Sequence, residues 1–159
     1  MQKALFASGC FWGTEYYLKR QKGVLSTSVG FTGGHIKNPA YREVCSGRTG
    51  HAEAVEVVFD PEVVSYEVLA KLFFETHDPT QLNRQGPDVG TQYRSEVFVY
   101  DSGQREVIER LIGQLKDDGL NVQTQISGVS PFYKADEYHH DYYDKTGGSP
   151  YCHIYTSRF

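Results

Sequence analysis

The sequence predicts an α+β fold in which helices cover a mixed or antiparallel β-sheet in two layers. The chain has 159 residues, the length of a single domain that can bury a sizeable core. Segments with strand and helix patterns alternate along it. Several of the strands are short and alternate in polarity, which is typical of sheets that have helices on one face.

Two predicted strands frame the first predicted helix. KALFAS, residues 3–8, is a short apolar run that is typical of a buried strand. GCFWGTEYYLKRQKG, residues 9–23, is predicted as a turn into a helix, because its aromatic residues recur at helical spacing and Gly23 ends the pattern. VLSTSVGF, residues 24–31, alternates in polarity like a strand.

The same alternation continues through the rest of the chain. AEAVEVVFD, residues 52–60, is predicted as a strand that ends at Pro61. SYEVLAKLFFETHD, residues 65–78, is predicted as an amphipathic helix with Ser65 as its N-cap. The later predicted elements are a strand at 96–100, a helix at 102–119, a strand at 121–127 and a short helix at 134–145.

Two long segments, 32–50 and 79–95, are predicted as loops because they are rich in Gly, Pro, Asn and Ser. Long loops are uncommon in compact domains and are often functional. The polar and thiol side chains of interest in these loops are Tyr41, Cys45, Asp88 and Tyr93.

The charge, hydropathy and cysteine count of the chain argue against several classes of protein. The 16 Lys and Arg residues and the 20 Asp and Glu residues are interspersed and give a net charge of −4, which argues against nucleic acid as the main partner. We identify no targeting segment and no stretch of membrane-span length. Three cysteines do not make a secreted disulfide scaffold, so we expect a reducing, cytoplasmic setting. In a reducing compartment, a cysteine is a packing residue, a metal ligand or a reactive thiol.

Cys10 is the first candidate for chemistry, because it opens the first predicted helix. The N–H groups and partial positive charge of a helix N-terminus favour thiolate, and thiol pKa values there fall from about 8.5 to roughly 3.5–7.5. Gly9 and Gly13 beside it permit close approach of another molecule. The alternative is that Cys10 is a small buried apolar residue.

Phe11, Trp12 and Glu53 extend this candidate site. Neighbouring residues of a helix point in different directions, so at least one of the two aromatic rings should wall the space near Cys10, where it would suit a methyl group on sulfur. Glu53 begins a strand that is otherwise apolar at alternate positions. Burial would raise its pKa and let it donate a proton, whereas a solvated strand end is the alternative.

The remaining histidines and cysteines predict no metal site. His139 and His140 are adjacent, so on a helix they would point apart, and we expect them to be solvated. Cys152 lies in a Gly- and Pro-containing tail, residues 145–159, which we expect to be mobile. A thiol there could resolve a sulfenic acid at Cys10 into a disulfide. Cys45 competes for that role, and Cys152 could also be incidental.

Four motifs, taken together, resemble the peptide methionine sulfoxide reductase A family over essentially the whole chain. They are GCFWGTE, NPAYREVCSGRTGHAEAVEVVFDP, FFETHDPTQLNRQGPDVGTQYRS and EYHHDYYDK. The resemblance implies that Cys10 is the nucleophile and that Phe11 and Trp12 hold the S-methyl group. It implies that Glu53 protonates the sulfoxide oxygen and that Tyr41 and Tyr93 donate hydrogen bonds to it. Asp88 matches a further polar residue of that site, and Cys152 matches the resolving cysteine.

The resemblance also implies a fold, a reaction and partners. The fold is a two-layer α/β sandwich with a ferredoxin-like core. The reaction reduces methionine S-sulfoxide, free or in oxidised proteins, and leaves a Cys10 sulfenic acid that Cys152 converts into a disulfide. Thioredoxin or another dithiol reduces that disulfide, and no bound cofactor or metal is implied. Since no cysteine follows Cys152, thioredoxin would act on the Cys10–Cys152 disulfide directly. We expect a monomer.

Two other classes of protein remain as alternatives. One is a different thiol enzyme, such as a thiol peroxidase or a cysteine hydrolase with a histidine base. The other is a module without catalysis that binds oxidised peptides. Loss of turnover in Cys10→Ser separates the reductase from the binding module, whose affinity would survive that change.

Overall fold

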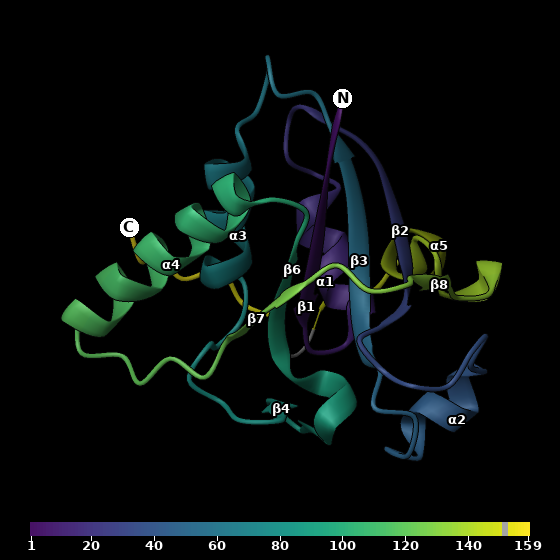
Figure 1. Ribbon diagram of the computed structural model, residues 1–159. Coiled ribbons are helices and arrows are strands. Elements are labelled where there is room, and N and C mark those ends of the chain that lie inside the picture. Colours follow the sequence, from purple (N-terminus) through teal and green to yellow (C-terminus); the bar gives the residue numbers. More distant parts are fainter. Residues whose placement is uncertain (151–152) are drawn as a thin grey trace.

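The computed structural model describes residues 1–150 and 153–159, which build a six-stranded sheet with helices against it (Figure 1). The strands, in sheet order, are β7 (Gln125–Gly128), β6 (Ser95–Val99), β1 (Gln2–Ser8), β3 (Ala52–Phe59), β2 (Val24–Thr32) and β8 (Tyr133–Lys134). In this sheet β6 and β7 run parallel, and the other neighbours are antiparallel. The predicted α+β fold with a mixed sheet is confirmed.

The centre of the sheet has the predicted ferredoxin-like topology. Helix α1 (Phe11–Leu18) connects β1 to β2, and α3 (Tyr66–Glu75) connects β3 to β6. The resulting β-α-β-β-α-β order, with the strands arranged β6-β1-β3-β2, is that of ferredoxin-like folds. The short strands β7 and β8 extend the two edges of this core.

One face of the sheet and the helices enclose the main core. Helix α4 (Ser102–Asp117) packs beside α3 and contributes the buried residues Ile108, Leu111 and Leu115. The predicted cap of α3 is confirmed, because the Ser65 Oγ accepts a hydrogen bond from the Val68 N–H at 3.2 Å.

The central strands are buried on their other face as well. There Leu5, Ala7 and Phe98 form a smaller apolar cluster, against which Phe132 packs. Phe132 lies in the segment between β7 and β8, which crosses this face of the sheet from one edge to the other (Figure 1). Both faces of β1 are therefore covered, which explains why ALFA is an unbroken apolar run.

The two long loops contain short helices and strands, which the sequence did not indicate because these segments are rich in turn-forming residues. The first contains α2 (Tyr41–Cys45), and the second contains β4 (Arg84–Gln85), β5 (Asp88–Val89) and the 3₁₀ turn Thr91–Tyr93. Figure 1 shows α2 and β4 gathered at one end of the sheet, at the bottom of the view. This is the end at which β1 passes into α1.

The predicted helix at 134–145 is wrong as a single element. A 3₁₀ turn, Glu137–His139, precedes α5 (Tyr142–Thr146). Asp141 between them has a φ of 54°, a left-handed conformation that interrupts any continuous helix. No helix in the described parts of the chain is both long and apolar enough to cross a membrane.

Candidate active site

Cys10 lies in the turn between β1 and α1. Gly9 has a φ of 97°, which glycine adopts readily, and a Cβ at this position would lie 2.7 Å from the Cβ of Gln85. Cys10 is the N-cap residue of α1, and its carbonyl accepts a hydrogen bond from the Gly13 N–H at 3.1 Å. The side chain of Cys10 is buried. The predicted strand-to-helix turn at this cysteine is thus present.

Glu53 reaches the same turn from β3. Side chains alternate between the faces of a strand, so Glu53 shares the helix-covered face with Val55 and Val57. Its Oε1 accepts a hydrogen bond from the Phe11 N–H at 3.2 Å. The carboxyl group therefore binds the peptide group that joins Cys10 to Phe11.

The environment of Glu53 favours the protonated carboxyl. The side chain is fully buried, and burial raises its pKa from 4.5 to about 8. The Phe11 N–H acts against this shift, and the negative charge of Asp88 adds to it. The Oε2 has no hydrogen-bond partner among the residues that the structure describes. The group can hold a proton at neutral pH and donate it, so it is not a solvated strand end.

Tyr41 and Tyr93 bring two phenol groups from the long loops to this carboxyl. Tyr41 is the first residue of α2, and Tyr93 is the last residue of its 3₁₀ turn. Burial raises the pKa of both phenols, and the nearby charge of Glu53 raises it further. Both hydroxyls therefore remain protonated hydrogen-bond donors over the physiological range.

Asp88 and Cys45 complete the polar side of the site. Asp88 lies in β5, and its charge raises the pKa of Glu53 and of Tyr93. Cys45 ends α2, and its thiol lies near the hydroxyls of Tyr41 and Tyr93. Burial raises the pKa of this thiol, and the two phenol contacts oppose that shift.

Phe11 and Trp12 form the apolar side and are buried to different extents. Phe11 is fully buried, and its ring centroid lies 6.2 Å from that of Tyr41. Trp12 is half-buried and stacks on Tyr142, with ring centroids 3.7 Å apart and planes within 6°. The Trp12 Nε1–H donates to the Nδ1 of His139 at 3.2 Å. Trp12 thus has a fixed orientation at the edge of the site.

The predicted solvent exposure of His139 and His140 is wrong, because both are buried. The His139 ring lies among the aromatic rings, with its centroid 4.3 Å from that of Tyr41. Burial lowers the pKa of His139, which keeps the imidazole neutral and lets its Nδ1 accept from Trp12. The His140 Nε2 donates to the Ala135 carbonyl at 3.0 Å. The 3₁₀ turn directs both rings inward, whereas a continuous surface helix would not.

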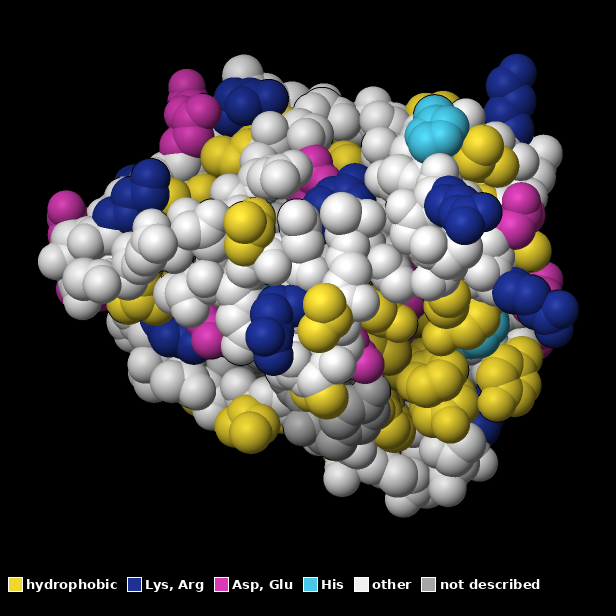
Figure 2. All heavy atoms as spheres, turned by 90° about the horizontal axis from the view of Figure 1, so that it is seen from below, with side chains coloured by type: hydrophobic (Ala, Val, Ile, Leu, Met, Phe, Trp, Pro, Cys, Tyr) yellow, Lys and Arg dark blue, Asp and Glu magenta, His cyan; other side chains and the backbone are white. Residues whose placement is uncertain are grey.

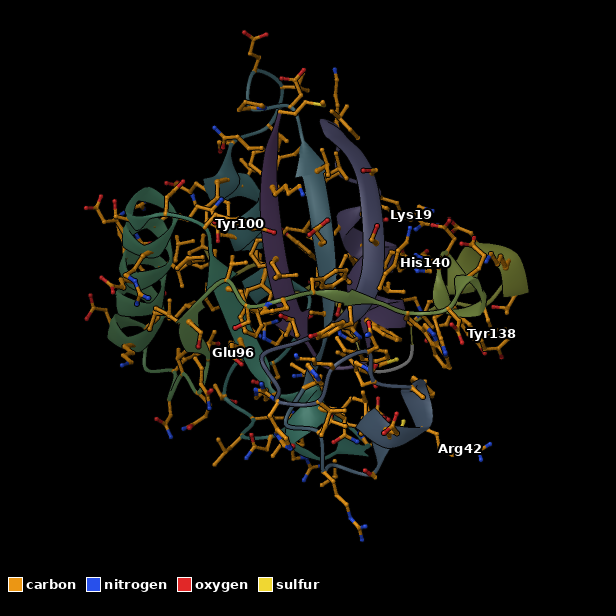
Figure 3. The ribbon with its side chains drawn as sticks, turned by 45° about the vertical axis from the view of Figure 1, so that its right-hand side comes forward. Lys19, Arg42, Glu96, Tyr100, Tyr138 and His140 are labelled. Carbon is orange, nitrogen blue, oxygen red and sulfur yellow. The ribbon has the colours of Figure 1, made fainter. Side chains whose placement is uncertain are left out.

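Glu15 of α1 holds the segment that supplies His139 and Tyr142. Its buried carboxylate accepts hydrogen bonds from the Asp141 N–H at 2.6 Å and from the Thr27 hydroxyl at 2.9 Å. Lys19, the C-cap residue of α1, forms an ion pair with Asp141. Figure 3 shows Lys19 and His140 on the α5 side of the sheet, with Tyr138 pointing outward.

The surface around this end of the sheet is apolar in part. Figure 2, which views the molecule from below, shows hydrophobic side chains gathered at the lower right with a histidine among them. Tyr138, next to His139, is 67% exposed. Arg42, the second residue of α2, points outward from this helix (Figure 3).

Cys152 lies outside the described residues, so its predicted role is untested by the structure. The described part of the tail, residues 153–159, packs against α1 and α3. The Tyr17 hydroxyl donates to the His153 carbonyl at 2.9 Å, and the Thr156 N–H donates to the Glu75 carbonyl at 2.7 Å. Across residues 1–150 and 153–159, no three His, Cys, Asp or Glu side chains form a group that could hold a metal ion.

The structure brings together Cys10, Phe11, Trp12, Tyr41, Glu53, Asp88 and Tyr93 at one end of the sheet, and their roles stay predictions. Two further residues of this cluster, His139 and Tyr142, were not predicted as site residues, and the nearness of the Cys45 thiol to the two phenols was not predicted either. For His139 and Tyr142, the sequence signal was the high density of aromatic and histidine residues in EYHHDYYDK, to which the sequence analysis assigned no part in the site. For Cys45 it was the spacing of four residues from Tyr41, one helical turn.

The family model "Peptide methionine sulfoxide reductase" matches residues 2–159. A similar protein is the peptide methionine sulfoxide reductase MsrA of Saccharolobus solfataricus, which is 48% identical over 158 residues, 99% of this chain and 89% of that protein. Among solved structures, reduced Mxr1 from Saccharomyces cerevisiae has a TM-score of 0.90 at 33% identity, covering 99% of this chain and 92% of that one. Methionine sulfoxide reductase A of Corynebacterium diphtheriae has a TM-score of 0.85 at 38% identity, covering 94% and 77% of the respective chains. The chain belongs to the peptide methionine sulfoxide reductase family.

Proposed function

We propose that this protein reduces methionine S-sulfoxide, free or within oxidised proteins, to methionine with Cys10 as the nucleophile. The observation that carries the proposal is Glu53, a buried carboxyl with a raised pKa that is bound to the peptide group next to Cys10. A sulfoxide oxygen is a poor leaving group until it is protonated, and this carboxyl can supply the proton.

In the proposed reduction step, the Cys10 sulfur attacks the sulfoxide sulfur. Glu53 protonates the sulfoxide oxygen, while Tyr41 and Tyr93 donate hydrogen bonds to it as charge develops. The protonated oxygen then passes from the substrate sulfur to the Cys10 sulfur: the transient sulfur–sulfur bond and the sulfur–oxygen bond of the substrate break, and a sulfur–oxygen bond forms on Cys10, which leaves methionine and a Cys10 sulfenic acid. The substrate sulfur is reduced and the cysteine sulfur is oxidised, so the step needs no other reductant.

The aromatic side of the site suits the rest of the substrate. Trp12, stacked on Tyr142 and oriented by His139, offers a rigid apolar surface to the S-methyl group. Phe11 supports this surface from the core side. Asp88 helps Glu53 to keep its proton. The polar side of the site suits the sulfoxide oxygen and the apolar side suits the S-methyl group. Only one arrangement of these two groups about the sulfur fits both sides, so we expect the site to prefer one epimer of the sulfoxide.

We further propose that Cys152 resolves the sulfenic acid. Its sulfur attacks the Cys10 sulfur, the sulfur–oxygen bond breaks, and hydroxide leaves as water with the thiol proton. Thioredoxin or another dithiol then reduces the disulfide. In support, Mxr1, a family relative, has also been solved in complex with Trx2. The single catalytic domain 1–159, the mobility of tail 145–159, the cytoplasmic setting and the monomeric state stay predictions.

A stereochemically resolved assay tests this function. The wild-type protein and Cys10→Ser are each given the S and R epimers of methionine sulfoxide with thioredoxin as reductant. We expect methionine from the S epimer alone and none from either epimer with Cys10→Ser. Full activity of Cys10→Ser, or equal turnover of both epimers, would overturn the proposal. Ligand binding without turnover in the wild type would favour the binding module instead.

A further inference from the structure

Tyr41 and Tyr93 are held in the site in different ways. The Tyr41 ring packs against aromatic neighbours, with its centroid 4.3 Å from that of His139 and 6.2 Å from that of Phe11. In the described parts of the chain, the Tyr93 ring stacks on no other ring. The position of the Tyr93 phenol therefore depends on how its backbone is held at the end of the short 3₁₀ turn.

Gln92, directly before Tyr93, links the two long loops. Its side chain is 5% exposed, and its Nε2 donates a hydrogen bond at 3.4 Å to the carbonyl of Cys45, the last residue of α2. Gly90 leaves room for this amide, because a Cβ there would lie 2.3 Å from the Gln92 Oε1. The Gly90 φ of 142° is also one that favours glycine. The hydrogen bond ties the turn that carries Tyr93 to the helix that begins with Tyr41.

Arg94, directly after Tyr93, makes a second link between the same loops. Its Nη2 donates to the Gly50 carbonyl in the first loop at 3.1 Å, and its Nη1 donates to the Thr91 carbonyl at 2.9 Å. Its Nε donates at 2.7 Å to the Oε1 of Glu96 on β6, which Figure 3 labels. The side chains of this ion pair are 12% and 5% exposed. One planar guanidinium thus joins the turn to the sheet and to the other loop.

We infer that Gln92 and Arg94 are positioning residues, which hold the Tyr93 phenol on the oxygen side of the site from both of its chain neighbours. The inference rests on the proposed role of Tyr93 as a hydrogen-bond donor to the sulfoxide oxygen. Such a donor acts only where charge develops, and loss of one costs about 10²- to 10³-fold in rate. A displacement of about 1 Å can cost about 10²-fold.

Single-turnover methionine release from methionine S-sulfoxide tests the inference in a Tyr41→Phe background. Without the Tyr41 hydroxyl, Tyr93 is the one proposed phenol donor that remains. Gln92→Met keeps the length of the side chain and removes its amide, so it should slow release by about ten- to a hundredfold in this background. When Tyr93 is also replaced by Phe, Gln92→Met should slow release by less than about twofold further, because no phenol remains to be positioned.

Arg94→Lys applies the same test to the second link. A lysine keeps a positive charge beside Glu96, whereas loss of the charge would leave a buried carboxylate unpaired and strongly destabilise the fold. The lysine lacks the planar set of N–H groups that reaches Glu96 and two carbonyls together. We expect slowing by about ten- to a hundredfold in Tyr41→Phe, and by less than about twofold once Tyr93 is also Phe.

Arg84 provides a matched control in the second loop. Its side chain is exposed, and its Nη2 donates to the Gly86 carbonyl at 2.8 Å, so this hydrogen bond stays within one loop. Arg84→Met removes a bond between a guanidinium and a carbonyl without cutting a link between the loops. Methionine release by Arg84→Met should equal that of its parent in every background.

The outcomes separate the inference from the proposed function, and each residue is judged by its own variants. No slowing in the Tyr41→Phe background would remove that residue from the positioning role. Equal slowing with and without the Tyr93 hydroxyl would do the same, since the residue would then act on something other than the phenol. If Tyr41→Phe/Tyr93→Phe were as fast as the wild type, the proposed role of the phenols would fail, and the inference with it. Slowing that requires the Tyr93 hydroxyl would support both.

Discussion

Replacement of Glu53 by Gln removes the proposed acid with little change in shape. An amide keeps an oxygen for the Phe11 N–H, but it has no proton of suitable acidity for the sulfoxide oxygen. General acid catalysis of this kind contributes about 10²- to 10⁴-fold, so we expect the reduction step to slow by that range. In the wild type the step should also slow as pH rises through about 8, where Glu53 loses its proton.

The same substitution changes the pH dependence of stability. The pKa of Glu53 is about 8 in the folded chain against an ordinary 4.5, so between these values the folded state binds more protons than the unfolded state. The free energy of unfolding therefore falls as pH rises, by about 1.4 kcal/mol per pH unit. From about pH 5 to about pH 8 the loss sums to roughly 3 kcal/mol, and Glu53→Gln should not show it.

Two measurements check these expectations. Single-turnover methionine release at several pH values gives the reduction rate, and urea unfolding at pH 5 and pH 8 gives the free energies. Glu56→Gln is the matched control, since Glu56 lies on the same strand and accepts a hydrogen bond from Tyr100 instead. A Glu53→Gln rate equal to the wild type would remove Glu53 from the acid role. Parallel stability curves for Glu53→Gln and wild type would contradict the raised pKa.

Three further expectations follow from the site and the core. Tyr142→Ala removes the ring that is stacked on Trp12, so KM for the sulfoxide should rise more than kcat falls in steady-state assays. Cys45→Ser keeps a hydrogen-bonding group for the two phenols and should recycle with thioredoxin within about twofold of the wild-type rate if Cys152 is the resolving cysteine, as proposed; loss of the Cys10 disulfide in this variant would reverse the assignment. Leu111→Ala opens a cavity in the main core and should cost about 2–5 kcal/mol in urea unfolding with an unchanged reduction rate at low temperature; a cost under that range would mean that the site collapses around the smaller side chain.

The elements that local sequence patterns determine were predictable. β3 alternates in polarity, α4 has an apolar stripe, and Ser65 caps α3 through its own hydroxyl, so each follows from neighbouring residues. The placement of Cys10 at a strand-to-helix turn belongs to the same group. The resemblance of the four motifs then supplied the ferredoxin-like order, which alternation alone left open.

The sequence could not place residues whose environment comes from distant parts of the chain. The buried His139 accepts a hydrogen bond from Trp12, which lies 127 positions away in the chain. No local periodicity of the sequence predicts that contact. Asp141 adopts a left-handed conformation that Glu15 stabilises through a hydrogen bond to its N–H, so the predicted helix breaks there. The contact of Cys45 with Tyr93 joins two loops, and only the folded sheet brings them to one end.

The hydrogen bond from the Phe11 N–H, the first of α1, to Glu53 fixes the spacing between the proposed acid and the nucleophile. Both groups belong to the sheet and its first helix, whereas Tyr41 comes from one long loop and both Asp88 and Tyr93 come from the other. The proposed acid and nucleophile, together with Phe11 and Trp12, therefore lie on the sheet and its first helix, and the loops add the phenols and the charge that raises the pKa of Glu53. Sequence changes in the two loops should therefore alter the hydrogen bonding to the sulfoxide oxygen while the spacing between acid and nucleophile stays the same.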